Sequence, residues 1–265
     1  MKLNSKPNSK FSYWPELIAA PLYPLLAWQG RRTRAMTPRL PEASDQAYGL
    51  WHGNSSADSL RILGIGESPV AGVGVANYEE AITAQLAKAL AGKLDAAVAW
   101  QALGQNGARL SWARQALPTF CQEQDPTQAQ PLPAWDLILV AFGVNDTTSF
   151  CPVNNYRTEL QSLLDELQML LKPSGLIVLA GVPPMQVFPA LPTPLRQVLG
   201  MKARALDQIN REMATSRQQV LHLPFTANLQ DVRQMAEDGY HPSALGVSIW
   251  AEELAKTFLQ NRQEK

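Results

Sequence analysis

The chain has 265 residues, of which 46% are hydrophobic and 17% are charged, and its 23 basic and 23 acidic residues cancel to a formal net charge of zero. This balance excludes a nucleic-acid-binding protein, which would show a basic excess, and a disordered chain, which would show low hydrophobicity and high charge. The two cysteines, Cys121 and Cys151, exclude a disulfide scaffold and a four-thiolate zinc site, and we expect both to be buried free thiols.

The N-terminal stretch, residues 11–28, is apolar and aromatic, but Glu16 and three prolines interrupt it. The arginines Arg31, Arg32 and Arg34 follow it directly. A membrane-spanning helix needs ~20 uninterrupted apolar residues, and a cleavable secretory signal would end in small residues that do not follow here. Three interpretations stay open: a segment packed on the body, an interfacial membrane anchor with its arginines at the headgroups, or an uncleaved anchor.

Residues 35–58 contain prolines and glycines and show little periodicity, which is typical of a linker. We therefore divide the chain into an apolar and basic segment with a linker, residues 1–57, and one folded domain, residues 58–265. Because no cleavable signal peptide is recognised, we expect a cytoplasmic protein or one associated peripherally with a membrane through residues 11–34.

From residue 58 onward, short apolar runs alternate with stretches of helical spacing. The apolar runs predict buried strands at residues 60–65, 95–103, 137–142, 176–180 and 220–223. Apolar positions at helical spacing predict helices over residues 78–91, 110–120, 155–171, 195–216 and 243–259. The strands are apolar throughout rather than alternating, so we expect a five-stranded parallel sheet covered by helices on both faces.

Polar residues stand where these strands end. Gly66-Glu67-Ser68 follows the first strand, Gly107 follows the second, and Gly143-Val144-Asn145-Asp146 follows the third. Asp238-Gly239-Tyr240-His241 lies between the fifth strand and the last helix. Because the ligand site of an open parallel sheet lies at the carboxyl ends of its strands, we expect these four groups to meet at one edge.

These residue types suit acyl transfer to water. Ser68 is a weak nucleophile until a base removes its proton, and His241 can be that base. Asp238, three residues earlier, can reach the imidazole and fix its tautomer and orientation. Each residue alone also has an ordinary structural role: a serine after a strand often only caps a helix, and an acid–imidazole pair often lies on a solvated surface.

The tetrahedral intermediate of acyl transfer needs hydrogen-bond donors for its oxyanion. The backbone N–H of Gly107 and the side-chain amide of Asn145 are two candidates. The backbone N–H of Ser68 is a third, and we expect it to stand at the start of a helix, where the helix dipole strengthens it.

The four groups, in this order, resemble the blocks of the GDSL or SGNH hydrolases, esterases and lipases of the bacterial type. The resemblance covers residues 59–260 and implies a three-layer α/β/α, flavodoxin-like fold. It implies a catalytic triad of Ser68, Asp238 and His241, with Ser68, Gly107 and Asn145 forming the oxyanion hole. The chain departs from the family pattern in having Glu67 before the serine, where the family has Asp, and Pro69 after it.

The function that these residues predict is hydrolysis of small-molecule carboxylic esters with short acyl or acetyl groups, through an acyl-enzyme on Ser68. Two alternatives stay open: an acyltransferase with the same triad, and a flavodoxin-like binding module without catalysis. We expect no cofactor, because the glycines near residue 66 do not have dinucleotide-loop or phosphate-loop spacing. We expect no metal, because neither His52 nor His222 has metal-ligand spacing to another histidine.

Overall fold

The computed structural model describes residues 14–53, 59–124, 134–226 and 228–263. Within these ranges six strands form one sheet in the order β1–β3–β2–β4–β5–β6. β1 pairs with β3 in antiparallel fashion, and the other neighbours are parallel. The strand bounds are β1 (Tyr48–Trp51), β2 (Leu60–Gly66), β3 (Val98–Gly104), β4 (Trp135–Ala141), β5 (Leu171–Ala180) and β6 (Val220–Leu223).

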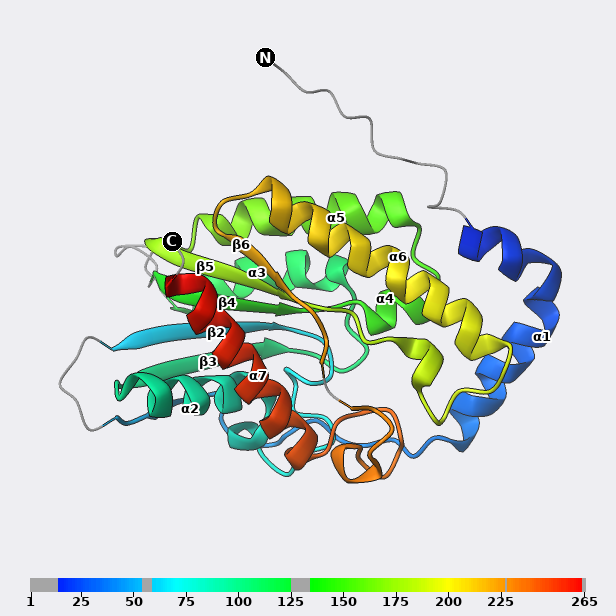
Figure 1. Ribbon diagram of the computed structural model, residues 1–265, viewed down its shortest axis with the longest axis horizontal. Coiled ribbons are helices and arrows are strands. Elements are labelled where there is room, and N and C mark those ends of the chain that lie inside the picture. The colour runs from blue at the N-terminus through cyan, green and yellow to red at the C-terminus, as the bar shows by residue number, and fades with distance from the viewer. Residues whose placement is uncertain (1–13, 54–58, 125–133, 227, 264–265) are drawn as a thin grey trace, which may run out of the picture.

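Helices cover both faces of the sheet, as Figure 1 shows. One face carries α3 (Leu110–Gln124), α4 (Val144–Thr148), α5 (Val153–Gln168) and α6 (Leu195–Ser216), and the other carries α2 (Ile82–Leu94) and α7 (Ala244–Gln263). Among the described residues, three short 3₁₀ helices lie in the connections: η2 (Tyr78–Glu80), η3 (Met185–Val187) and η4 (Val232–Gln234). This is the three-layer α/β/α fold that was expected.

The pleat of the central strands explains the layers, because successive side chains point to opposite faces. On β4, Leu137 and Leu139 belong to the hydrophobic cluster under α2 and α7, whereas Ile138 and Val140 belong to the cluster under α3, α5 and α6. All four side chains are buried. A strand with apolar residues on both faces therefore fits only in the middle of such a sandwich.

The sheet has six strands and not five, because β1 lies in the stretch that was expected to be a linker. Residues 48–51 pair with residues 98–101 of β3. Two acidic side chains just before β1 also bond to the body: Asp45 accepts from the backbone N–H of Tyr78 at 2.7 Å, and Glu42 from that of Asn106 at 2.5 Å. The linker prediction is therefore wrong for these residues. The predicted boundary between residues 57 and 58 falls outside the described residues.

The five predicted parallel strands and five predicted helices are all present, most of them with shifted ends. The largest shift is in β5, which begins at Leu171 and not at residue 176, and so includes Pro173, Ser174 and Gly175. An irregular register between Trp135 and Leu137 accommodates this extra length. The helix expected from residue 78 begins as η2 and becomes α-helical only at Ile82.

The apolar N-terminal segment forms α1 (Trp14–Met36), which packs on α6. Ala19 and Leu26 are buried against the main core, so one side of α1 is packed on the body, as the first of the three interpretations predicted. In the described part of the chain, no helix is long and apolar enough to cross a membrane. Cys121 and Cys151 are free thiols, but they are half-buried and not fully buried as expected.

Candidate active site

Ser68 follows β2 in a tight turn at the carboxyl edge of the sheet. The N–H of Glu67 donates to the carbonyl of Ala141 at 3.0 Å, which extends the β2–β4 pairing by one residue. The N–H groups of Val70 and Ala71 then donate to the carbonyl of Glu67, so the chain turns sharply at the serine. No helix begins at Ser68, since α2 starts only at Ile82, so the expected helix dipole behind its N–H is a wrong prediction.

Asp238 and His241 form a close pair on the loop before α7. Oδ2 of Asp238 lies 2.6 Å from Nδ1 of His241, and Oδ1 accepts from the backbone N–H groups of Tyr240 and His241 at 2.9 and 3.0 Å. Burial opposes the charge on Asp238, but the hydrogen bonds from His241 and the backbone outweigh it and hold the pKa of Asp238 below its ordinary value. The carboxylate thus stays ionised and directs Nε2 of His241 away from the acid.

Glu67 links the serine turn to Asn145. Its carboxylate accepts three hydrogen bonds: from the backbone N–H of Val144 at 2.9 Å, from that of Asn145 at 2.9 Å, and from the Asn145 side-chain Nδ2 at 2.6 Å. The side chain is almost fully buried. Burial raises the pKa of Glu67 to about 7 even though these hydrogen bonds act in the opposite direction. One amide hydrogen of Asn145 is used by Glu67, and the other is left for a different acceptor.

The turn after β3 carries Gly107, whose φ is +78°. A Cβ there would meet no atom within 4 Å, so it is the left-handed backbone and not lack of space that favours glycine. Asp146, next to Asn145, accepts from the backbone N–H of Leu110 at 3.2 Å. This buried carboxylate joins the end of β4 to the start of α3, just after the Gly107 turn.

A cavity of about 80 Å³ lies at this edge, and both Ser68 and His241 line it. Most of its wall is apolar, including Phe142, Phe188 and Trp250. The structure therefore brings the predicted nucleophile, base and, through His241, the predicted acid to one cavity. The predicted oxyanion donors Gly107 and Asn145 are not among its lining residues. The side chain of Asn145 is hydrogen-bonded to Glu67, which does line the cavity.

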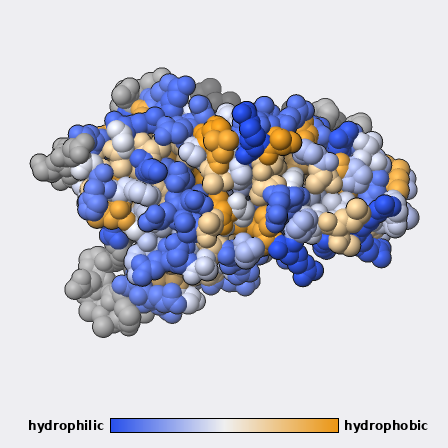
Figure 2. Space-filling view, turned by 90° about the horizontal axis from the view of Figure 1, so that it is seen from below, coloured by the Kyte–Doolittle hydropathy of each residue, from blue (hydrophilic) through white to orange (hydrophobic). Residues whose placement is uncertain are grey.

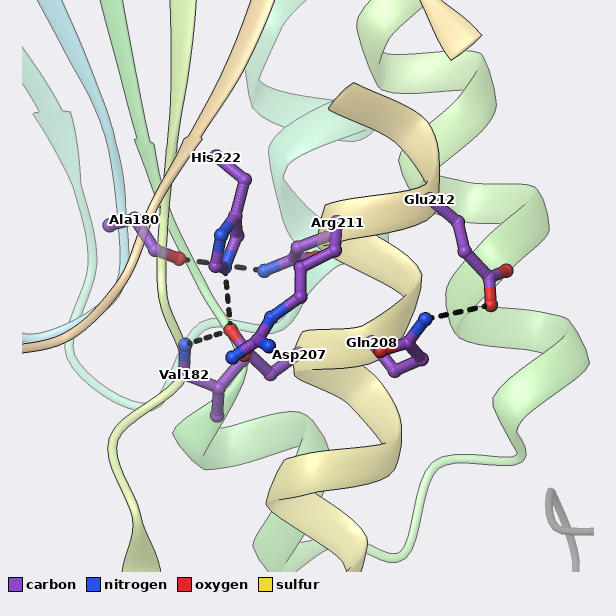
Figure 3. Close-up of polar contacts among 8 residues, drawn as sticks. Ala180, Val182, Asp207, Gln208, Arg211, Glu212 and His222 are labelled. Atoms are coloured by element: carbon purple, nitrogen blue, oxygen red, sulfur yellow. Dashed lines mark hydrogen bonds and ion pairs between the residues drawn. The ribbon is translucent and has the colours of Figure 1, made fainter. Parts of the chain in front are cut away.

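A second acid–imidazole pair lies under the same edge but has a structural setting (Figure 3). Asp207 on α6 contacts Nε2 of His222 at 2.8 Å, accepts from the backbone N–H of Val182 at 2.9 Å, and accepts from Arg211 at 2.8 Å. Burial opposes its charge, yet these contacts lower its pKa. Val182 stands between two residues that line the cavity, Gly181 and Pro183, so this pair holds the loop after β5 in place.

Sequence reasoning missed the part that Glu67 plays. The sequence marks it only as a departure from the family pattern, whereas its carboxylate holds the backbone and side chain of Asn145. The aromatic residues of the cavity, Phe188 and Phe225, were missed as well. Their order in the sequence carries no signal of this kind, because each follows a different strand and the two meet only in the folded chain.

Comparison with known proteins places the chain among hydrolases of this fold. The family model described as "GDSL-like Lipase/Acylhydrolase family" matches residues 65–249. Similar solved structures include a lipase from a goat rumen metagenome (14% identity, TM-score 0.56, 74% of this chain and 96% of that one). The psychrotrophic esterase EstA from Pseudoalteromonas sp. is also similar (19% identity, TM-score 0.52, 76% and 97%).

A third solved structure, the salicylyl-acyltransferase SsfX3 from a tetracycline biosynthetic pathway, has 17% identity and a TM-score of 0.54, over 78% of this chain and 56% of that one. A search of curated proteins finds no match. At these identities the structures show a shared fold, and the family model carries the assignment because it covers more than half of the chain. The chain belongs to the GDSL-like lipase/acylhydrolase family.

Proposed function

We propose that the protein hydrolyses carboxylic esters through an acyl-enzyme on Ser68, with His241 as general base and Asp238 as the residue that orients it. The observation that carries this proposal is that Ser68 and His241 line one cavity while Asp238 holds Nδ1 of the imidazole at 2.6 Å. Membership of a lipase and acylhydrolase family supports the same reaction class.

In the proposed reaction, Ser68 Oγ attacks the carbonyl carbon of the ester while Nε2 of His241 takes the hydroxyl proton. The tetrahedral intermediate collapses, its carbon–oxygen bond to the alcohol breaks, and His241 returns the proton to the leaving alcohol. A water molecule then attacks the acyl-enzyme by the same route, which releases the carboxylic acid and restores Ser68. The free amide hydrogen of Asn145 and the backbone N–H groups of Ser68 and Gly107 are the proposed oxyanion donors.

The size of the cavity favours small acyl groups. A water molecule needs ~10–15 Å³ of such space, so a cavity of about 80 Å³ has room for roughly five to eight water molecules. The apolar wall suits a short hydrocarbon chain better than a charged group. We therefore propose acetyl and other short acyl esters as substrates.

Labelling with a phosphonate tests the proposal, since the similar Pseudoalteromonas esterase is inhibited by monoethylphosphonate. Mass spectrometry should find one adduct, on the peptide that contains Ser68. Ser68→Ala should abolish labelling and lower kcat by several orders of magnitude. Ser149→Ala removes a hydroxyl group from the nearby end of α4 and should leave both unchanged. An adduct on another residue, or more than about a tenth of wild-type activity in Ser68→Ala, would refute the proposal.

The alternative of acyl transfer is tested with the same enzyme. If an added alcohol intercepts the acyl-enzyme, the ratio of new ester to free acid measures the preference for alcohol over water. A chain that neither labels at Ser68 nor cleaves any ester would instead fit the binding module.

A further inference from the structure

One face of α1 is fixed against the body. Ala19 and Leu26 are buried. Gln29 bonds twice to the chain around the start of α6: its Nε2 donates to the carbonyl of Thr193 at 2.8 Å, and its Oε1 accepts from the N–H of Leu195 at 3.1 Å. Glu16 forms an ion pair with the fully buried Lys202. These contacts decide which side of the helix turns outward.

The opposite face of α1 is apolar and open to solvent. Leu17 is 68% exposed and Trp28 is 54% exposed, and Ala20, Pro21 and Pro24 between them are also exposed. No charged residue occurs between Leu17 and Trp28, and the acidic residue just before them, Glu16, is engaged by Lys202 on the inner side. A helix face that only meets water would carry polar or charged side chains. A continuous apolar face of this kind marks a site of interaction.

Positive charge follows this face directly. Arg31, Arg32 and Arg34 lie on the last turns of α1, and all three are exposed. The guanidinium of Arg32 lies 5.4 Å from the centre of the Trp28 ring, so the aromatic and basic parts are in contact. Figure 2 shows hydrophobic side chains among hydrophilic ones at the right-hand end of the molecule, which is the end where Figure 1 places α1.

The basic end of α1 is near enough to the active-site cavity for its charge to act on a residue of the cavity wall. Burial and the charge of Asp238 raise the pKa of Tyr240 to about 12, and the nearby charge of Arg34 opposes this rise. Tyr240 is one of the residues that line the cavity. Whatever α1 docks on is therefore brought close to the cavity.

We propose that the outer face of α1 docks on an anionic lipid bilayer, with Leu17 and Trp28 in the interface and Arg31, Arg32 and Arg34 at the headgroups. The prolines of α1 fit a helix that lies at the depth of the lipid headgroups. Pro21 and Pro24 have no N–H for the carbonyls of Leu17 and Ala20, four residues earlier, and these carbonyls need the water of the headgroup region. A second copy fits the face less well, because it would add the same arginines and bring no free acidic group from α1.

Sedimentation with vesicles tests the proposal on the full chain. The protein should bind vesicles of phosphatidylcholine mixed with phosphatidylglycerol and bind vesicles of phosphatidylcholine alone much more weakly. Arg31→Gln with Arg32→Gln should weaken binding to the anionic vesicles about thirtyfold. Leu17→Ser with Trp28→Ser should weaken it at least about tenfold.

The matched control combines Met169→Ser with Lys256→Gln, an exposed apolar and an exposed basic residue outside α1, and should bind as the native chain does. The thermal midpoint of each variant shows that it is folded. Neither the vesicle binding nor the thermal midpoint depends on the proposed esterase activity. The proposal would be overturned if the native protein did not bind anionic vesicles. It would also be overturned by binding that both α1 variants retain, or by a dimer in light scattering that these variants dissociate.

Discussion

The buried carboxyl of Glu67 should make the stability of the protein depend on pH in a direction opposite to that of most acidic groups. Its pKa is raised from 4.5 to about 7 in the folded protein because burial disfavours the charge. Between these two values the folded chain holds a proton that the unfolded chain has lost. The contribution of Glu67 to the unfolding free energy is therefore fully present below about pH 4.5 and is lost as the pH rises through about 7.

The size of the effect follows from the shift. One pKa unit corresponds to ~1.36 kcal/mol, so a rise from 4.5 to about 7 corresponds to about 3 kcal/mol of unfolding free energy. Glu67→Gln removes the ionisation and keeps the length of the side chain. It also turns an amide N–H toward the donors of Val144 and Asn145, which adds a penalty that does not change with pH. The test therefore uses the change with pH and not the absolute difference.

Urea unfolding from pH 4 to pH 8 measures this change. Relative to Glu67→Gln, the wild-type chain should lose about 3 kcal/mol of unfolding free energy across this range. Glu237→Gln, an exposed glutamate beside the Asp238 loop, is the matched control, and its curve should run parallel to that of the wild type. Parallel curves for wild type and Glu67→Gln would refute the reasoning, as would a difference that grows in the opposite direction.

Three further substitutions test other contacts. Asn145→Ala should lower kcat ~10²–10³-fold if it removes the proposed oxyanion donor. Steady-state kinetics in which only KM rises would assign Asn145 to binding instead. Asp207→Asn should lower the unfolding free energy by about 1–3 kcal/mol, because His222 and Arg211 lose the ionised carboxylate that they contact. The folded protein holds the pKa of Asp207 below its ordinary value of 3.8, so the full loss should be seen above about pH 3.8, and the urea curves of variant and wild type should converge only as the pH falls further, through the lowered pKa. Glu16→Ala should lower the unfolding free energy measured with urea by about 3 kcal/mol, because Lys202 is then buried without its partner. Adding Lys202→Met should restore most of this free energy, and no recovery would contradict the explanation.

The layered fold was predictable because its signals are local. The run from Leu137 to Phe142 is apolar at every position, which fits only a strand buried on both faces, and β4 occupies residues 135–141. The helix over residues 195–216 was predicted with its observed ends, because its apolar spacing is regular over six turns. β1 carries no such pattern: its four residues alternate between exposed and half-buried, and only pairing with β3 makes them a strand.

The sequence alone also determined which residues stand at the ends of the strands, because parallel strands deliver their carboxyl ends to one edge and the order of the chain gives the residues after each strand. It could not determine how those residues contact one another. Glu67 and Asn145 are 78 positions apart, and the bond between them exists only because β2 and β4 are neighbours in the sheet. The outward face of α1 was likewise decided by tertiary contacts. Leu17 and Leu26 are the same residue type in one apolar run, and the packing against α6 buries one and leaves the other in water.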